Sequence, residues 1–214
     1  KGMNNTAFRK AIKEDLGKVE VACIGEAGEN QVRFASIMTG VKNAAGRTGM
    51  GAVMGSKNIK AIVVAKSKRG EDSQEFIDYA RKLYGKISES KVAKRLKKYG
   101  TPFLYALSNI LGAIRTRNSQ QTRFDHSLDG ENFKKFFTGS VSCYNCAVQC
   151  RHKNALGGEG PEYSLVGSFG ANLGIADPEA VIRLNNVAND LGLDGSSAGS
   201  IIAWATELYE RDLI

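Results

Sequence analysis

Residues 44–58 read AAGRTGMGAVMGSKN, and this glycine run leads into the apolar stretch IKAIVVAKS at 59–67. Glycine lets a backbone approach a ligand or another segment closely, and it can turn N–H groups toward phosphate oxygens. Arg47 and Lys57 add cationic donors. The Walker A order is absent, and no strand is expected directly before the run, as a dinucleotide-binding fingerprint requires. The run therefore predicts either a tight crossing of backbones or a cradle for a phosphorylated cofactor.

The sequence around the run predicts an α+β fold. A polar helix is expected over 5–16, a largely buried strand over 19–25, and a second strand over 59–67. Residues 68–70 (Lys-Arg-Gly) mark a change in composition, and helical patterns follow over 73–87, 91–100 and 101–112. Asp177 and Pro178 begin a further helix that Gly192 closes, and Ser196 or Ser197 is expected to cap the last one. We therefore expect a β-containing part over 1–68 and a mainly α-helical part over 69–214.

Composition narrows the class of protein. The chain has 214 residues, 42% hydrophobic and 24% charged, which is ordinary for a globular protein. Its apolar runs are of strand length, so no membrane span is predicted. Four cysteines are too few for a disulfide-stapled secreted domain, which favours a reducing compartment and a cytoplasmic location. The chain begins without an initiating methionine and stops inside a helical pattern, so we expect it to be an excerpt of a longer protein.

The net charge of +8 is concentrated in residues 81–100, which carry eight Lys/Arg and a single Glu. A nucleic-acid surface is one interpretation, but no nucleic-acid-binding motif accompanies the charge, and we predict no such partner. A solvated helix face, or a patch that receives an acidic partner or an anionic substrate, explains the charge equally well.

Three cysteines lie in the eight residues CYNCAVQC at 143–150: Cys143, Cys146 and Cys150. This C-x2-C-x3-C spacing lets several sulfurs converge on one small volume at little entropic cost. A [4Fe–4S] cluster would need a fourth thiolate from elsewhere, whereas a Cys3His zinc site could use His152. Cys23 lies in an apolar strand, where a buried structural thiol is the commoner meaning. His126 and His152 do not form a ligand pair and are otherwise expected to be structural or solvent-facing.

Several motifs, in this order, resemble the aldehyde:ferredoxin oxidoreductase family. Residues 33–64, RFASIMTGVKNAAGRTGMGAVMGSKNIKAIVV, resemble its tungstopterin-binding segment, and CYNCAVQC resembles its cluster motif. GAIRTRNSQ at 112–120 resembles its G-x-x-P-T-R-N stretch, with Arg115 where proline is usual. EGPEY at 159–163 resembles its glutamate-bearing segment, and NDLGLD at 189–194 resembles its pterin motif D-x-x-G-L-[CD].

The resemblance implies domains and cofactors. Residues 1–68 would be the C-terminal part of the N-terminal pterin-binding domain, and 69–214 the start of the α-helical iron–sulfur and pterin-binding domain. The implied cofactors are a tungsten (or molybdenum) bis-pterin, a Mg²⁺ that bridges the pterin phosphates, and a [4Fe–4S] cluster. In this family the fourth cluster cysteine lies in the C-terminal third, which would place it beyond residue 214.

The resemblance also implies roles for individual residues. Cys143, Cys146 and Cys150 would ligate the cluster, and Glu162 would be a catalytic acid/base near the metal. The cofactor-binding residues would be Ala44 and Ala45 toward the magnesium, Gly46, Arg47 and Gly49 at the pterin phosphates, and Asn189 and Asp194 at a pterin edge. Two departures stand out: Asn189 replaces the usual aspartate, and Asn43 stands where a basic residue is common.

The implied reaction is oxidation of an aldehyde to a carboxylic acid. Electrons would pass through the cluster to ferredoxin or to a partner subunit, and the chain alone is expected to be inactive. A homodimer is a further expectation. One alternative is a ring-reducing subunit that resembles benzoyl-CoA reductase within the same family. The others are a Cys3His zinc-stabilised binding module without redox activity, and an electron-transfer or scaffold subunit that keeps the cluster but has lost the pterin.

Overall fold

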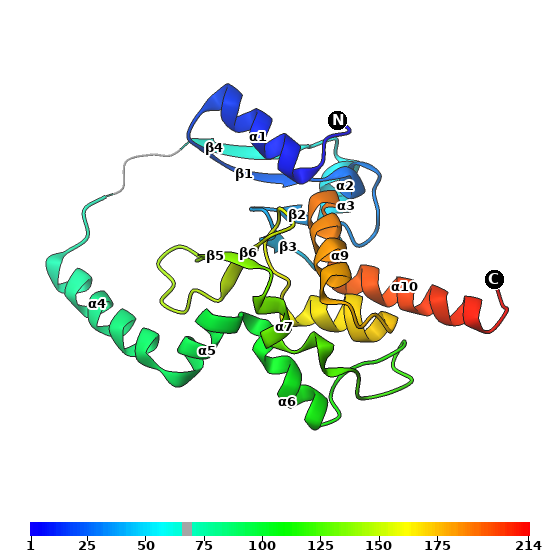
Figure 1. The fold of residues 1–214 in the computed structure, drawn as a ribbon. Coiled ribbons are helices and arrows are strands. Elements are labelled where there is room, and N and C mark those ends of the chain that lie inside the picture. Colours follow the sequence, from blue (N-terminus) through cyan, green and yellow to red (C-terminus); the bar gives the residue numbers. More distant parts are fainter. Residues whose placement is uncertain (66–69) are drawn as a thin grey trace.

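The computed structural model describes residues 1–65 and 70–214, and it confirms an α+β fold (Figure 1). The N-terminal part is an antiparallel sheet in the order β3-β2-β1-β4. Its strands are β1 (Val19–Ile24), β2 (Ile37–Met38), β3 (Ala44–Ala45) and β4 (Ala61–Ala65). The long pair β1–β4 runs in register from Val19 opposite Ala65 to Cys23 opposite Ala61.

Helix α1 (Asn5–Leu16) covers one face of this sheet, as Figure 1 shows. Alternation along β1 turns Val19, Val21 and Cys23 into a small core beneath the helix. Asn5 is fully buried at the start of α1, and its amide donates to the carbonyl of Gly40 (3.0 Å) in the β2–β3 turn. The sheet therefore holds the segment that leads into the glycine run.

The glycine run begins as strand β3 and continues into helix α3 (Met50–Ser56), which packs on the short helix α2 (Glu26–Glu29). The packing is by backbone. A Cβ on Gly55 would lie 1.8 Å from the Gly28 carbonyl oxygen, and one on Gly51 would lie 2.6 Å from that of Ser36. Gly49 has a φ of 73°, and a Cβ there would lie 2.1 Å from the Arg33 carbonyl oxygen. Strand β3 is formed by the first two residues of the run itself, and the preceding strand β2 is separated from the run by the turn at residues 39–43.

The second part is mainly helical and adds one hairpin. Its α-helices are α4 (Gln74–Glu89), α5 (Lys91–Tyr99), α6 (Leu104–Ile110), α7 (Gly130–Lys134), α8 (Tyr163–Leu165), α9 (Pro178–Leu191) and α10 (Gly195–Glu210). Short 3-10 or π turns are η1 (Thr101–Phe103), η2 (His126–Leu128), η3 (Val166–Gly170) and η4 (Ala171–Leu173). The hairpin pairs β5 (Phe137–Val141) with β6 (Arg151–Asn154).

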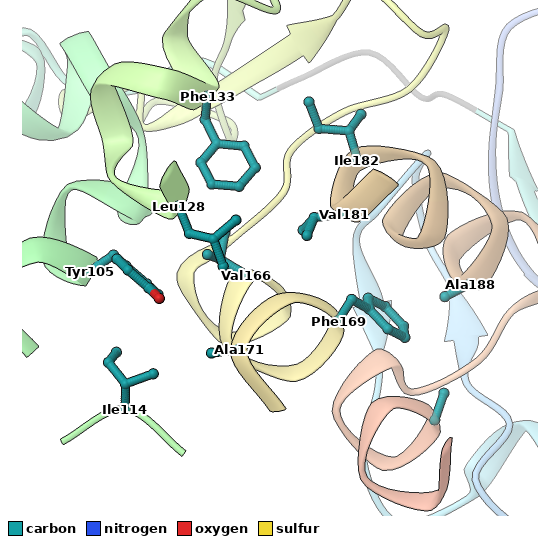
Figure 2. Close-up of a cluster of buried hydrophobic side chains, with 11 residues drawn as sticks. Tyr105, Ile114, Leu128, Phe133, Val166, Phe169, Ala171, Val181, Ile182 and Ala188 are labelled. Atoms are coloured by element: carbon teal, nitrogen blue, oxygen red, sulfur yellow. The ribbon is translucent and has the colours of Figure 1, made fainter. Parts of the chain in front are cut away.

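The larger hydrophobic core lies in this second part (Figure 2). Phe169 and Val166 of the π turn η3 meet Val181 and Ile182 of α9, and Phe133 of α7 closes the cluster from the other side. All five side chains are at most 2% exposed. This core fixes α9, and therefore the position of the NDLGLD motif at its C-terminal end.

Backbone contacts join the two parts beside the glycine run. The Ser36 N–H donates to the Gly192 carbonyl (2.8 Å), and the Asp194 N–H donates to that of Phe34 (2.9 Å). A Cβ on Gly25 would lie 2.3 Å from the Leu191 carbonyl oxygen, so only glycine fits this crossing. The segment that precedes the glycine run and the NDLGLD motif are therefore neighbours in space.

Most of the predicted elements agree with the structure. The helix over 5–16 is α1, both strands are present as β1 and β4, and Asp177 caps α9 by accepting from the Glu179 N–H (2.9 Å). The cap of α10 is Asp194 rather than Ser196 or Ser197. The predicted boundary at residues 68 and 69 lies outside the described residues. No helix among the residues described combines the length and apolar character that a membrane crossing needs.

Candidate functional site

The cysteine loop, residues 143–150, connects β5 to β6. Cys143 is exposed, Cys146 and Cys150 are partly buried, and none of the three forms a disulfide. The Cys146 N–H donates to the Cys143 carbonyl (3.1 Å), which folds these two residues into one turn. No group of three or more His, Cys, Asp or Glu side chains within residues 1–65 and 70–214 is gathered as a ready metal site. The three thiols are therefore close in the sequence, but their sulfur atoms do not point to one common position.

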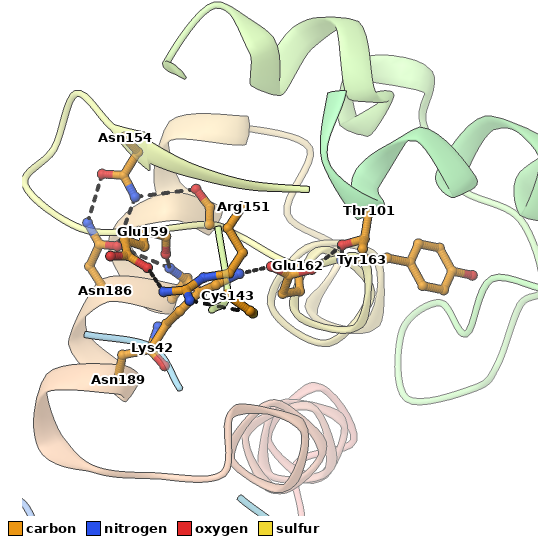
Figure 3. Close-up of polar contacts among 12 residues, drawn as sticks. Lys42, Thr101, Cys143, Arg151, Asn154, Glu159, Glu162, Tyr163, Asn186 and Asn189 are labelled. Carbon is orange, nitrogen blue, oxygen red and sulfur yellow. Dashed lines mark hydrogen bonds and ion pairs between the residues drawn. The ribbon is translucent and has the colours of Figure 1, made fainter. Parts of the chain in front are cut away.

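Cationic residues surround the loop (Figure 3). Arg151 directs Nη1 at Cys143 Sγ (3.8 Å) and pairs through Nη2 with Glu159. Both members of this pair are almost buried, with 12% and 11% of their side chains exposed. The buried Arg151 Nε has no hydrogen-bond partner among the described residues. A buried donor of this kind normally has a partner, so an acceptor at the thiols would complete the arrangement.

Lys42 connects the glycine run to this charged group. It lies in the turn between β2 and β3, directly before the run, and its ammonium group pairs with the Glu162 carboxylate (Figure 3). Only 9% of its side chain is exposed. Burial lowers the pKa of Lys42 to about 8, and the charge of Arg151 adds to this effect. Glu159 and the thiolate forms of Cys150 and Cys143 act in the opposite direction.

Glu162 lies at the N-terminal end of α8, next to the cis Gly160–Pro161 bond. Its second carboxylate oxygen accepts from Thr101 Oγ1 (2.5 Å), and Thr101 in turn accepts from the Tyr163 N–H (2.8 Å). The side chain is 32% exposed and is paired with a cation. Both carboxylate oxygens of Glu162 are therefore engaged, one by the Lys42 ammonium group and the other by the Thr101 hydroxyl.

The predicted pterin motif on α9 lies in a network of amide side chains. Asn189 Nδ2 donates to Asn185 Oδ1 (3.3 Å), and Asn185 donates to the Glu159 carbonyl (2.9 Å). Asn154 and Asn186 extend the network toward β6 (Figure 3). Asn189 also lines a cleft of about 420 Å³ between α1, α9 and the turn that follows β6. The side-chain amide of Asn189 can therefore donate a hydrogen bond to Asn185, which a carboxylate at this position could not do.

Asp194 caps helix α10. Its carboxylate accepts from the N–H groups of Ser196 (3.2 Å) and Ser197 (3.3 Å) and from the Ser197 hydroxyl (2.5 Å). Arg47 Nε lies 3.9 Å from the same carboxylate, although 75% of the Arg47 side chain is exposed. The glycine run and the end of the NDLGLD motif therefore meet through a charged pair.

The predicted glycine-run residues divide into two groups. Gly49 is held by its positive φ and by the Arg33 carbonyl, so its backbone packing alone explains the glycine. Gly46 has open space where a Cβ would lie, with Ser36 Oγ 4.0 Å away as its nearest neighbour. Ala44 and Ala45 are exposed in β3. The unobstructed surface of the run therefore extends from Ala44 to Arg47.

The alternative ligands are engaged elsewhere. His152 stacks on Phe137 (4.2 Å between ring centroids), and its Nε2 lies 2.9 Å from the Lys97 carbonyl oxygen. Cys23 is fully buried in β1, where its thiol donates to Asn5 Oδ1 (3.4 Å) and burial raises its pKa. His126 is exposed beside Asp129. Within the part of the chain that the structure describes, none of His152, Cys23 and His126 is gathered with the three loop cysteines.

Comparison with known proteins decides the family. A family profile described as "Aldehyde ferredoxin oxidoreductase, domains 2 & 3" matches residues 78–214, and one described as its N-terminal domain matches residues 1–66. The chain belongs to the aldehyde ferredoxin oxidoreductase family. It is 43% identical over 217 aligned residues to the tungsten-containing aldehyde ferredoxin oxidoreductase of Pyrococcus abyssi, which covers 96% of this chain and 36% of that protein.

Two further relatives broaden the comparison. A "WOR-like subunit" of an aliphatic sulfonate oxidoreductase from Pyrococcus furiosus is 32% identical over 89% of this chain and 32% of that protein. Among solved structures, the active-site complex BamBC of benzoyl coenzyme A reductase matches all of this chain and 36% of its own, with a TM-score of 0.78 and 26% identity. The chain thus spans about a third of the length of these relatives.

Lys42, Arg151 and Glu159 are the site residues that sequence reasoning missed. Lys42 immediately precedes Asn43, and Arg151 immediately follows Cys150. Both Asn43 and Cys150 had already been identified as motif positions. A cation next to each of two candidate cofactor motifs is a weak but usable signal, because clustered thiolates and phosphates both attract positive charge.

Proposed function

We propose that this chain is part of a tungsten (or molybdenum) bis-pterin enzyme that oxidises an aldehyde to a carboxylic acid. The observation that carries the proposal is Lys42, which starts beside the glycine run and ends at Glu162 within the charged group around the cysteine loop. We infer that the two motifs would be neighbouring walls of one pocket, because Lys42 reaches from the run to the charged group beside the cysteines. The 43% identity to a tungsten-containing aldehyde ferredoxin oxidoreductase supports the choice of reaction class.

The residues present fit the implied groups in chemical kind. Cys143, Cys146 and Cys150 would supply three thiolates to a [4Fe–4S] cluster, with the fourth ligand outside this chain, and Arg151 Nε would gain an acceptor there. The backbone of Ala44 and Ala45, with Gly46, Arg47 and Gly49, would face the pterin phosphates and their Mg²⁺, and Asn189 and Asp194 would bind a pterin edge. The metal pterin supplies two-electron redox chemistry when it is bound.

This chain's own residues would then manage protons and charge. Oxidation of an aldehyde by water releases two protons and two electrons, so the site needs a base. Glu162 is our candidate, because Lys42 keeps it as a carboxylate and Thr101 fixes its orientation. Lys42 and Arg151 would stabilise the negative charge that the cluster gains when it accepts each electron. The electrons would leave singly, toward a ferredoxin or a partner subunit.

Four free cysteines in the described structure suit a reducing compartment, and we propose a cytoplasmic location. We also propose that residues 1–68 complete a pterin-binding domain and that 69–214 begin the next one, in keeping with the two family profiles.

A second candidate function is reduction of an aromatic ring in a coenzyme A thioester. The match of the whole chain to the BamBC complex, at a TM-score of 0.78, favours keeping it. The same cluster and pterin residues would serve either reaction, so the substrate decides between them.

Anaerobic purification of the full-length protein, followed by metal and pterin analysis, tests the proposal. We expect about four irons, one tungsten or molybdenum and two pterins per chain, a brown colour with absorption near 400 nm, and aldehyde-dependent reduction of a viologen dye. Dienoyl-CoA-dependent dye reduction without aldehyde activity would favour the second function. A colourless protein that contains zinc and no iron would rule out both.

A further inference from the structure

Helix α5 carries five cations and no acid in its nine residues, KVAKRLKKY. Lys91, Lys94, Arg95 and Lys98 recur at the spacing that brings side chains to one helix face, and all four are exposed. We call these four residues the basic face. On the other side of the helix Ala93 is buried and Leu96 is partly buried. The helix is therefore anchored by its apolar side and presents a concentrated positive charge to solvent.

The basic face lies beside the cysteine loop. Helix α5 ends at Gly100, and a Cβ there would lie 3.2 Å from the Cys150 carbonyl oxygen and 3.4 Å from His152 Nδ1. His152, two residues after Cys150, accepts or donates through Nε2 at the Lys97 carbonyl (2.9 Å). The C-terminal end of α5 is thus packed directly on the end of the cysteine loop.

Helix α4 flanks the loop from the other side. The side-chain amide of Gln149 donates to Tyr84 Oη (3.3 Å), and a groove of about 620 Å³ runs between α4 and the loop residues Asn145 and Ala147. The α4 side of the groove is apolar, with Phe76 and Ile87 about half exposed. An apolar groove next to a basic face is typical of surfaces on which charge steers a partner and apolar contact holds it.

Most of the charge of the basic face has no ion-pair partner among the described residues; only the Lys98 ammonium group lies over the Tyr99 ring and near Glu131. Across residues 1–65 and 70–214, none of Lys91, Lys94 and Arg95 takes part in an ion pair. The loop beside it exposes Cys143, and Tyr144 is 78% exposed. A redox centre held by this loop would therefore lie close to the surface that the basic face borders.

We propose that the basic face of α5, together with the groove along α4, is the docking site for an acidic one-electron carrier protein of the ferredoxin type. The proposal rests on the proposed function, because the carrier would collect electrons from a cluster at the cysteine loop. Electron transfer slows steeply with the separation of two redox centres, so a carrier must bind near the loop. Positive charge around the loop would raise the rate of encounter with an acidic protein and orient it.

The test uses the full-length, metal-loaded enzyme with an acidic two-cluster bacterial ferredoxin and, separately, methyl viologen as acceptors. The variant K94E/R95E reverses two charges of the basic face. Its matched control, K13E/K18E, reverses two exposed lysines at the end of α1 and just after it, on the N-terminal sheet unit (Figure 1). We expect K94E/R95E to raise the KM for ferredoxin by about tenfold or more at low salt, and the control by less than about twofold.

Salt and the dye supply the remaining readouts. Added NaCl should raise the wild-type KM for ferredoxin toward that of K94E/R95E, and the viologen rate of both variants should match the wild type. An unchanged ferredoxin KM in K94E/R95E would overturn the proposal. A loss of viologen activity in that variant would also overturn it, because it would show that the basic face is packed inside the enzyme.

Direct binding separates this proposal from the proposed function. If neither acceptor supports aldehyde oxidation, the reaction assignment fails, yet calorimetric titration of ferredoxin into the enzyme still measures docking. Salt-sensitive binding that K94E/R95E weakens and K13E/K18E does not would support the docking site. Tighter binding of duplex DNA than of ferredoxin at the same salt concentration would assign the basic face to nucleic acid and overturn the proposal.

Discussion

In the glycine run the backbone is fixed by other backbone, whereas in the cysteine loop the surroundings are fixed by charged side chains. Gly49, Gly51 and Gly55 each lie against a carbonyl where no Cβ fits. Around the cysteine loop, Lys42 and Arg151 each pair with a glutamate. One half of the candidate pocket therefore depends on shape, and the other depends on electrostatic balance.

The difference explains why the two halves should respond differently to substitution. A backbone crossing cannot relax around an added atom, because both partners are held by the rest of the fold. In a buried charged cluster, each charge carries a desolvation cost, so a charged side chain can be replaced without forcing the backbone to move. We therefore expect substitutions in the glycine run to damage the fold, and substitutions at the cysteine loop to damage chemistry.

The sharpest test of the comparison is Gly55→Ala. The new Cβ would lie 1.8 Å from the Gly28 carbonyl oxygen, which belongs to backbone and cannot rotate away. We expect destabilisation of about 3 kcal/mol or more, measured by chemical denaturation of the metal-free full-length protein. Gly85→Ala in α4 is the matched control, because nothing lies within 4 Å of its Cβ position. The control should be stabilised by about 0.5–1 kcal/mol. Equal stability of the two variants would refute the tight crossing.

Lys42→Met tests the electrostatic half. Burial lowers the pKa of Lys42 from 10.5 to about 8, and a shift of that size corresponds to at most about 3 kcal/mol. In the metal-free protein the charged amine is thus an unfavourable element of the fold. Lys42→Met removes this burial cost and also removes the ion pair with Glu162, so the difference in unfolding free energy between the two proteins should depend on pH.

The pH dependence of this effect follows from the same shift. Between pH 8 and 10.5 the unfolded chain binds more protons at Lys42 than the folded chain, so wild-type stability rises with pH in this window. The unfolding free energy of Lys42→Met minus that of the wild type should therefore fall from pH 7 to pH 10. Lys13→Met, at an exposed lysine, should show no such change. A difference that is constant with pH would mean that Lys42 is not desolvated.

The regular elements of the fold were predictable because their signals are local. Asp177 and Pro178 start α9, and Gly192 ends it in the left-handed conformation that glycine favours. The apolar stretch at 19–25 likewise predicted a largely buried strand before any partner strand was known. Each of these patterns is contained in a few consecutive residues.

The contacts that assemble the candidate site were less predictable. Lys42 meets Glu162 only because the sheet, the cysteine hairpin and α8 converge, and nothing near either residue in the sequence specifies the other. The glycine run admitted two interpretations, and the structure assigns backbone packing to Gly49 while it leaves Gly46 open. At residues 194–197 three side chains could cap α10, and Asp194 was missed because two serines follow it.

Asp194 lies where the glycine run meets the NDLGLD motif, and we expect its substitution to have a moderate effect on stability. Asp194→Ala removes the cap of α10 and should cost about 1 kcal/mol of stability, whereas Asp194→Asn keeps an acceptor oxygen and should cost a few tenths. Asp194→Asn also removes the charge that faces Arg47. Pterin analysis of this variant therefore isolates the carboxylate: loss of pterin at nearly normal stability would support its predicted role. Full pterin content would leave Asp194 as a helix cap alone.

The smallest effect on folding is expected at the exposed thiol, and its counterpart in the sheet makes the contrast measurable. Cys143→Ser changes one atom at the surface, so the metal-free protein should keep its stability within about 0.5 kcal/mol while iron and the absorption near 400 nm are lost. Cys23→Ser should lower the stability and leave the iron content unchanged. Cys23 is fully buried in the core of the sheet, and a hydroxyl in its place must be desolvated there. Iron content per chain and denaturation midpoints, measured on both variants, separate ligand from core. Retention of iron in Cys143→Ser would remove that thiol from the ligand set, and with it the contrast between a region that shapes the pocket and a region that carries its chemistry.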